Sequence, residues 1–184
     1  MHEHARAFAA AGGPLSRGRR AFREVLGAQR RTMGNEHPVT LDSIFNMAHL
    51  LLTQGRFDEA ETLFREEMAG RRRTQGGEHP TTLDSINRVA HLLLAKEEGG
   101  FDEAEPLLRE VLEAQRRTLG DAHADTLGSA SSMAHMLAAQ GRFGEAAHLF
   151  RETLEAQRRT LGDAHPDTLE SLRSLKLFNR LSPP

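Results

Sequence analysis

The sequence predicts an all-α protein built as a solenoid of helix pairs, because it repeats itself and each copy contains two helical patterns. The segment Glu110–Leu127 recurs at Glu152–Leu169 with 16 of 18 residues identical, at an offset of 42 residues. Units of this length bury their apolar faces only by stacking on their neighbours, so one continuous array is expected. A histidine marks the same place in each copy, at intervals of 42, 44 and 42 residues: His37, His79, His123 and His165.

The composition argues against several classes of function. The 24 Lys and Arg residues are balanced by 26 Asp and Glu residues, so the basic excess of a nucleic-acid-binding protein is missing. The chain has no cysteine, which excludes disulfides, thiolate metal sites and cysteine nucleophiles. The first residues lack the basic and apolar regions of a secretory signal, and no apolar run is long enough to cross a membrane. We therefore expect a soluble, cytoplasmic protein that contacts neither nucleic acid nor membrane.

The first full copy is interpreted as two helices joined by a glycine turn. Proline suits the first turn of a helix at residues 38–54, and Gly55 suits the left-handed position that ends it. The second helix is expected to begin near Asp58, whose carboxylate would cap it, with Glu61 completing a capping box. Apolar residues at helical spacing support both helices: Leu41, Ile44, Ala48 and Leu51 in the first, and Ala60, Leu63, Phe64 and Met68 in the second.

The other copies predict the remaining helices by the same pattern. A half-repeat comes first, with Phe22, Val25 and Leu26 as its apolar face, and residues 1–13 before it are expected to be partly helical or disordered. The 44-residue interval places two extra residues in the turn at 95–100. The last helix has a polar outer face, as the end of an array requires, and an apolar side of Leu169, Leu172, Leu175 and Phe178. Helices are expected at residues 14–32, 80–96, 102–118, 122–140, 145–160 and 166–181.

Four motifs at the turns carry a family resemblance. They are G-R-F-D-E-A-E at Gly55–Glu61, G-F-D-E-A-E-P-L at Gly100–Leu107, G-R-F-G-E-A-A at Gly141–Ala147 and L-G-D-A-H-P-D-T-L at Leu161–Leu169. From about Pro14 to Leu181 the chain resembles the tetratricopeptide repeat, in the 42-residue form of kinesin light chains and nephrocystin-like proteins.

The resemblance implies a right-handed superhelical solenoid of antiparallel helix pairs, with about three full repeats and a half-repeat at each end. Small residues at the crossing of each pair match those of the family, namely Ala48 and Ala60, Ala90 and Ala104, and Ala134 and Ala146. The expected division is an N-terminal segment at 1–13 and a solenoid at 14–184, with a half-repeat at 14–34, repeats at 35–76, 77–120 and 121–162, and a capping helix at 163–184.

The resemblance also implies that the first helix of each pair lines a concave groove, which binds a peptide segment of a partner protein. The protein would then be a non-enzymatic adaptor or scaffold. The predicted groove has an acidic edge, a row of histidines and an apolar edge, which suits a peptide with a basic group beside an apolar anchor. The predicted contacts are Asp42, Phe45, Asn46, His49, Leu52, Asp84, Asn87, Arg88, His91, Leu94, Ser131, Ser132, His135 and Arg173.

The histidines of this groove, His49, His91 and His135, have three possible interpretations: a metal ladder, a pH sensor, or scaffold and ligand contacts. Neighbouring helices lie about 8–10 Å apart, so the three rings would not converge on one ion. Scaffold or ligand contact is favoured, pH dependence stays open, and no metal or cofactor is expected. The other row, which begins with His37, is explained best by helix capping and loop packing.

Catalysis is not expected, because an active site is singular while the candidate groups recur with the repeat. The arginines at the ends of the second helices, including the triplet that begins at Arg71, are interpreted as partners of the helix dipole and of exposed glutamates. A structural alternative is a spacer or a fragment of a longer array that self-associates through the N-terminal half-repeat, around Leu15, Phe22 and Val25.

Overall fold

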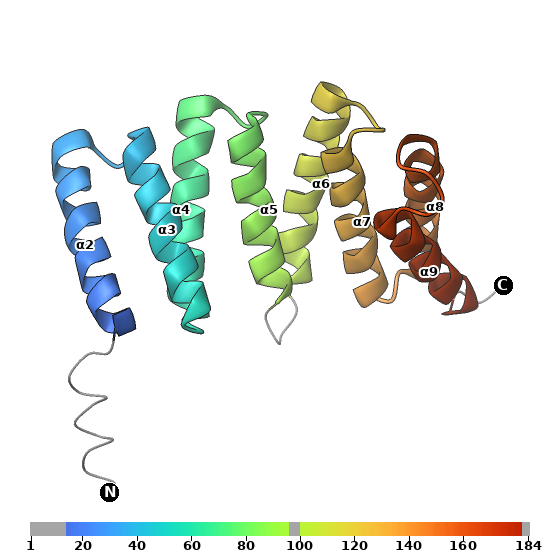
Figure 1. Ribbon diagram of the computed structural model, residues 1–184, viewed down its shortest axis with the longest axis horizontal. Helices are drawn as coiled ribbons and strands as arrows, with labels where there is room; N and C mark the ends of the chain where they lie inside the picture. The colour runs from blue at the N-terminus through green and yellow to red at the C-terminus, as the bar shows by residue number, and fades with distance from the viewer. Residues whose placement is uncertain (1–13, 96–99, 182–184) are drawn as a thin grey trace, which may run out of the picture. The chain divides into compact units, whose positions relative to one another are not determined.

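The computed structural model describes residues 14–95 and 100–181, and these form helices joined by turns (Figure 1). This confirms the all-α repeat fold. The expectations for residues 1–13 and for the two inserted residues near Ala95 fall outside, or at the edge of, the described residues. In chain order the helices are α2 (Pro14–Met33), α3 (Pro38–Thr53), α4 (Phe57–Gln75), α5 (Pro80–Leu94), α6 (Phe101–Leu119), α7 (Ala124–Ala139), α8 (Phe143–Thr160) and α9 (Pro166–Leu181).

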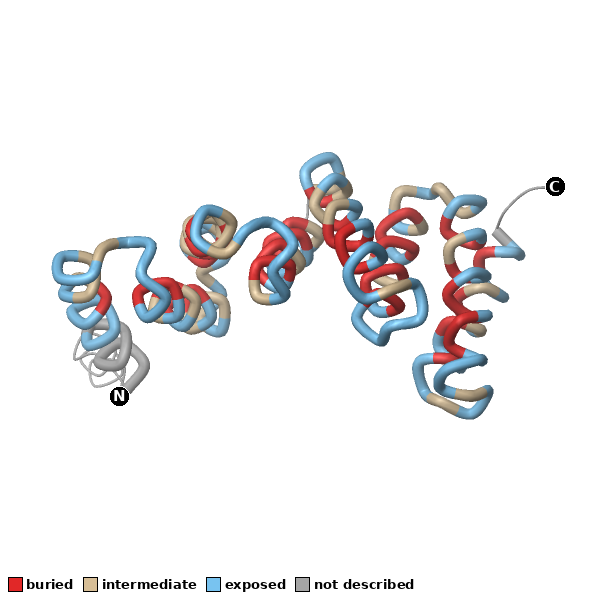
Figure 2. The backbone as a smooth tube through the Cα atoms, turned by 90° about the horizontal axis from the view of Figure 1, so that it is seen from above, coloured by how far each residue is buried: buried red, intermediate tan, exposed pale blue. Residues whose placement is uncertain are grey.

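The chain divides into two compact units within α5, Met1–Ser85 and Ile86–Pro184. In the first unit, α3 packs against both α2 and α4. In the second, α7 packs against both α6 and α8, and α8 packs against α9. Figure 2 shows buried positions recurring along the helices of both units, while most of residues 21–33 in α2 are exposed.

The first helix of each pair begins with a histidine cap. The Nδ1 atom of His37 accepts a hydrogen bond from the backbone N–H of Val39 at 3.3 Å, and Nδ1 of His123 accepts from that of Asp125 at 3.2 Å. His79 and His165 make the same contact two residues ahead. The bond satisfies one of the backbone donors that a helix start leaves unpaired. The capping interpretation of this row is therefore confirmed.

The second helices begin without side-chain caps, so the predicted capping box at Asp58 is wrong. The helices α4, α6 and α8 follow Arg56, Gly100 and Arg142, and none of these three accepts a backbone hydrogen bond through its side chain. The turn before α4 is tight, because Gly55 has a φ of 73° and the N–H of Arg56 donates to the Leu51 carbonyl at 3.0 Å. The chain thus enters the helix before Asp58, whose charge instead lies in the first turn.

The alanines predicted at the helix crossings are all completely buried: Ala48, Ala60, Ala90, Ala104, Ala134 and Ala146. The predicted apolar face of α9 is only partly right. Leu169 is 40% exposed, because no helix in the described part of the chain covers it as α8 covers its counterpart Leu127. The predicted Phe178 is buried, but the other buried positions lie one residue before the predicted ones, at Thr168, Ser171 and Ser174.

The two ends of the described chain differ in how they bury apolar side chains. The ring of Phe178 in α9 stacks on Phe143 and Phe150 of α8, with centroids 6.1 and 5.5 Å apart. In α2, by contrast, Phe22 is 39% exposed and Val25 is 51% exposed, while Leu26 is buried. The predicted apolar stripe of the first half-repeat is therefore present, but two of its three members face solvent.

Candidate functional site

In the first unit, side chains of the chain itself occupy the predicted binding face of α3. Phe45 is half-buried and lies against Phe64 of α4 and His49, with ring centroids 5.9 and 6.2 Å away. Asp42 accepts a hydrogen bond from Nη2 of Arg71 at 2.8 Å. The other predicted residues of α3 and the first turn of α5 are exposed or half-buried: Asn46, Leu52 and Asp84.

An unpredicted ion pair lies beside Asp42. Glu67 of α4 is 1% exposed, and its Oε1 accepts a hydrogen bond from Nε of Arg71, whose side chain is 13% exposed. The hydroxyl of Ser85 in α5 donates to the same oxygen at 3.0 Å. Burial alone would lower the pKa of the Arg71 guanidinium, but hydrogen bonds and charge from Glu67 and Asp42 raise it above its ordinary value. The sequence interpretation of Arg71 as an exposed partner of the helix dipole is therefore wrong.

The sequence does contain a signal for this pair, namely its departure from the repeat. Glutamine stands at the three positions equivalent to Arg71, at Gln29, Gln115 and Gln157. The positions equivalent to Glu67 hold Val25, Val111 and Thr153. Both positions are charged in one copy, and both are uncharged in the other copies. This pattern is expected where a charge pair takes the place of two uncharged side chains.

In the second unit, the predicted residues on the rest of α5 differ in their burial. Asn87 and Leu94 are half-buried, while Arg88 and His91 are exposed. Nδ2 of Asn87 lies 3.5 Å from the hydroxyl of Ser129 in α7. Desolvation by surrounding protein atoms lowers the pKa of the His91 imidazole, although the residue is exposed.

A groove of about 490 Å³ opens between α7 and α9, with α8 as its floor. Ser131 and His135 are the predicted residues that it brings together, and the His135 ring meets Phe150 edge-on with centroids 4.9 Å apart. Ser132 and Arg173 are not among its lining residues. These are Ala124, Leu127, Gly128, Ser131 and His135 from α7, Phe150 and Gln157 from α8, Leu161 and His165 from the following turn, and Asp167, Glu170 and Ser171 from α9.

Three substitutions between equivalent positions account for the opening of this groove. The equivalent residues of the two units are 86 residues apart, the sum of the 42- and 44-residue intervals. Gly128 stands where the first unit has Asp42, and Ser131 where it has Phe45. Gln157 replaces Arg71, while the aromatic floor, Phe64 and Phe150, is the same. Smaller side chains on α7 thus leave open a space that the first unit fills.

The floor residues Phe150 and Gln157 were not predicted as site residues. The sequence assigned the second helix of each pair to the scaffold, and both residues recur with the repeat or nearly so. The signal that could have found them is an aromatic residue shared by Phe64 and Phe150, combined with smaller residues on the first helix at Gly128 and Ser131.

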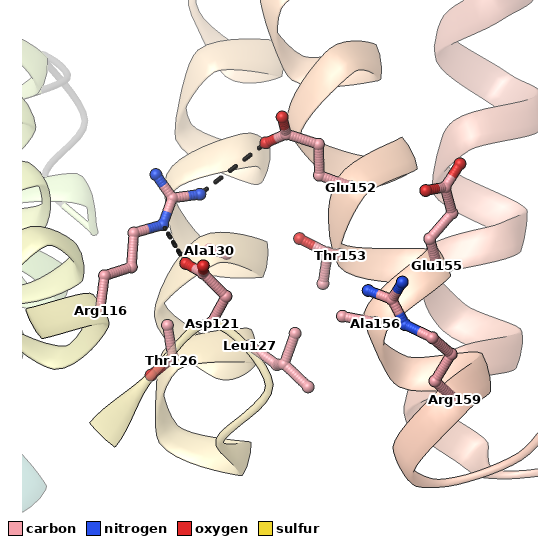
Figure 3. Close-up of a pocket in the computed structure, with 10 residues that line it drawn as sticks. All are labelled: Arg116, Asp121, Thr126, Leu127, Ala130, Glu152, Thr153, Glu155, Ala156 and Arg159. Atoms are coloured by element: carbon pink, nitrogen blue, oxygen red, sulfur yellow. Dashed lines mark ion pairs between the residues drawn. The ribbon is translucent and has the colours of Figure 1, made fainter. Parts of the chain in front are cut away.

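A second pocket, of about 390 Å³, lies among α6, α7 and α8 (Figure 3). Arg116 points toward Asp121 and Glu152, with nitrogen–oxygen distances of 3.3 and 3.8 Å. The equivalent pair in the first unit is closer, since Arg30 donates twice to Glu66 at 2.7 and 2.8 Å. The pocket therefore has a looser rim of mixed charge and contains no pair of groups arranged as a nucleophile and its base.

Across residues 14–95 and 100–181, no three His, Cys, Asp or Glu side chains are grouped so that they could hold a metal ion. Within the same described ranges, no helix combines the length and the apolar character needed to cross a bilayer.

Comparisons with known proteins agree on one family. A family model described as the tetratricopeptide repeat matches residues 4–73 and 42–117, and a second model of that description matches residues 126–167. No curated protein matches the chain.

Similar folds occur among solved structures. Two structures of a Podosopora anserina protein, described as a kinesin light chain with nearly identical TPR-like repeats, have TM-scores of 0.79 and 0.78. Each is 29% identical, and each match covers 98% of this chain and 84% of the other. BtubC (BKLC) from P. vanneervenii has a TM-score of 0.75 at 16% identity, over 94% of this chain and 68% of its own, and supports the fold alone.

Proposed function

Because this chain belongs to the tetratricopeptide repeat family, whose members generally mediate protein–protein interactions, we propose that it is a non-enzymatic interaction module. Its partner is a protein that presents a peptide segment, and the segment binds in the groove between α7 and α9. This refines the sequence-based proposal, which spread the contacts over the first helices of all the repeats. The division into repeats, the concave placement of these helices and the cytoplasmic location stay predictions from the sequence.

The observation that carries the proposal is the combination of an apolar floor and a hydrogen-bonding rim in one preformed groove. Leu161, which is 37% exposed, offers contact area for an apolar side chain, while Leu127 and Phe150 are buried within the floor. The hydroxyl, imidazole and carboxylate groups along the rim, including Ser131, can pair with the backbone of an extended peptide. Peptide-binding grooves use both elements, the first for anchoring and the second for orientation.

The same groove gives no support to catalysis. Ser131 and His135 lie one helical turn apart, yet no hydrogen bond joins them in the described structure, as a serine nucleophile and its base would need. His135 instead packs its ring against Phe150. The histidine recurs at the equivalent positions His49 and His91, and a group repeated in this way is expected to serve binding or packing.

The test is to select binding peptides from a random library and to measure their affinity by calorimetry. Replacing Ser131 by Phe, the residue at the equivalent Phe45, places a large ring in the groove and should weaken binding about tenfold or more. Glu155→Gln on α8 is the control, because Glu155 is exposed and lies outside the groove lining. Selected peptides that bind Ser131→Phe as tightly as the unaltered protein would show that the groove is assigned wrongly.

A second candidate function, self-association through α2, is supported by the exposed Phe22 and Val25. Apolar residues at the end of a repeat array are normally covered by a further unit or a partner. Analytical ultracentrifugation should then detect a concentration-dependent dimer that Phe22→Glu abolishes. A monomer at all concentrations would leave peptide binding as the only function proposed.

A further inference from the structure

We infer, resting on the binding function proposed above, that the partner peptide presents an arginine or lysine side chain to the groove between α7 and α9. We infer also that Arg71 supplies the equivalent cation from within the first unit.

The ionised groups of the groove favour a cation. Asp167 and Glu170, in the first turns of α9, are both lining residues, and the lining contains no Lys or Arg. Arg173 lies 3.8 Å from Glu170, but its side chain is 79% exposed, so this pair is weak and open to exchange. An anionic ligand would meet two carboxylates without a compensating charge, which disfavours it.

The buried side-chain oxygen of Gln157 is a second, independent observation that favours a ligand with N–H donors. Gln157 is 3% exposed, and its Oε1 has no hydrogen-bond partner among the residues that the structure describes. A buried acceptor without a donor is costly, so a ligand that brings N–H groups is favoured there. The side-chain oxygens of Gln29 and Gln115 have no hydrogen-bond partner either, so the unpaired acceptor is a property of this position of the repeat. Arg71 is the exception.

In the first unit, Arg71 stands at the position equivalent to Gln157 and has hydrogen-bond partners nearby. Its guanidinium is hydrogen-bonded to Glu67 and to Asp42, so this unit already contains the cation that its acids require. In the second unit the counterparts of these acids are uncharged, Thr153 and Gly128, and the carboxylates come from α9 instead. The second unit thus has acids on the opposite wall, and Arg173 beside Glu170 is too exposed to neutralise them as Arg71 does in the first unit.

The shape of the groove fits a long cationic side chain. Gly128 and Ser131 leave room along α7, and the exposed Leu161 suits the aliphatic stem of Arg or Lys. Such side chains bury their methylene groups while the charged end stays near polar partners. An apolar anchor next to the cation in the peptide would complete the contact with the floor.

The experiment compares two amidated tripeptides, acetyl-Leu-Arg-Leu and its citrulline counterpart, which has nearly the same shape as arginine but no charge. Titrations are followed by amide NMR shifts of the full chain at millimolar peptide. We expect the arginine peptide to move the signals of Ser131 and Glu170, and to bind roughly five- to tenfold more tightly than the citrulline peptide at low salt. Glu170→Gln should remove most of that difference, and the control Glu155→Gln should keep it.

A reciprocal substitution tests the role assigned to Arg71. Gln157→Arg gives the second unit the residue of the first and should abolish the preference for the charged peptide, while Gln157→Met, which is similar in size but uncharged, should keep it. Melting curves check that both variants are folded. Equal binding of the two peptides to the unaltered chain would overturn the cation inference and leave peptide binding intact. If neither peptide shifts the amide signals of the groove residues, the proposed function itself is overturned.

Discussion

Arg71 donates a hydrogen bond from Nε to a carboxylate, that of Glu67, which is almost completely buried. A charge pair in such a place depends on both partners, because either one alone would be a desolvated charge. The pair distinguishes its own repeat from the other copies, in which the equivalent positions are uncharged.

This dependence can be measured by a double-mutant cycle. Arg71→Gln alone leaves Glu67 buried without its cation and should lower the free energy of unfolding by about 2–4 kcal/mol. Adding Glu67→Val, so that both positions match Val111 and Gln115, should restore most of the loss. Urea unfolding of the single and double variants gives the values. A double variant as unstable as the single one would contradict this account.

Larger side chains at the helix crossings should lower the free energy of unfolding. Ala60 and Ala104 are completely buried where the two helices of a pair approach each other. Replacing either by Leu should overpack the crossing and lower the free energy of unfolding by roughly 1–3 kcal/mol. A thermal melt detects this as a lower Tm, and an unchanged Tm in both variants would count against the close approach.

The pH dependence of stability should include a contribution from Glu105 in α6. Partial burial alone would raise the pKa of Glu105, but hydrogen bonds and charge from Arg109 and Arg142 lower it below its ordinary value. A carboxyl whose folded pKa is lowered stabilises the protein above its unfolded pKa, and this contribution is lost as the pH falls through the folded pKa. The loss is therefore expected in the acid range, below about pH 4.5.

The measurement is urea unfolding at pH 7 and pH 3 for the unaltered chain and for Glu105→Gln. The variant lacks the titrating group, so its stability should fall less between the two values, by about 1 kcal/mol or less for a partly exposed pair. Glu155→Gln serves again as the control, because its carboxylate is exposed. Identical pH profiles for the unaltered chain and Glu105→Gln would remove Glu105 from the explanation.

Arg173 is expected to oppose ligand binding, although the sequence placed it among the peptide contacts. It lies outside the groove lining and pairs weakly with Glu170, so it competes with a cationic ligand for that carboxylate. Arg173→Ala should therefore strengthen binding of acetyl-Leu-Arg-Leu amide by about two- to fivefold at low salt. Weaker binding in this variant would return Arg173 to the contacts.

The sequence predicted the helices well, because glycine turns, apolar spacing and the repeat all point to the same boundaries. It failed where a residue differs from its own copies for reasons of packing. Arg71 was placed on the surface because arginine is rarely buried, and only its contact with Glu67 explains the exception. Leu169 was placed on the apolar side of the last helix because it lies at helical spacing with Leu172 and Leu175, although no following helix covers it in the described structure.

For the candidate site, the sequence placed Phe45, Asn87, Ser131 and Arg173 among the predicted contacts, but could not tell which of them lines a groove. That depends on the volume left between helices. Ser131 lines the groove because it is small and lies above Phe150, whereas Phe45 fills its own place against Phe64. The position of a residue in a helix determines the direction of its side chain. The free volume around that side chain depends on the sizes of the neighbouring side chains.

The histidine caps have a further consequence for how arrays of this kind can change. Each first helix starts from its own local bond, at His37, His79, His123 and His165, and needs no contact from the groove to form. Residues such as Gly128 and Ser131 can therefore be exchanged without disturbing where their helix begins. A copy can gain or lose a ligand through a few such exchanges, so the number of ligands that an array binds need not follow the number of its repeats.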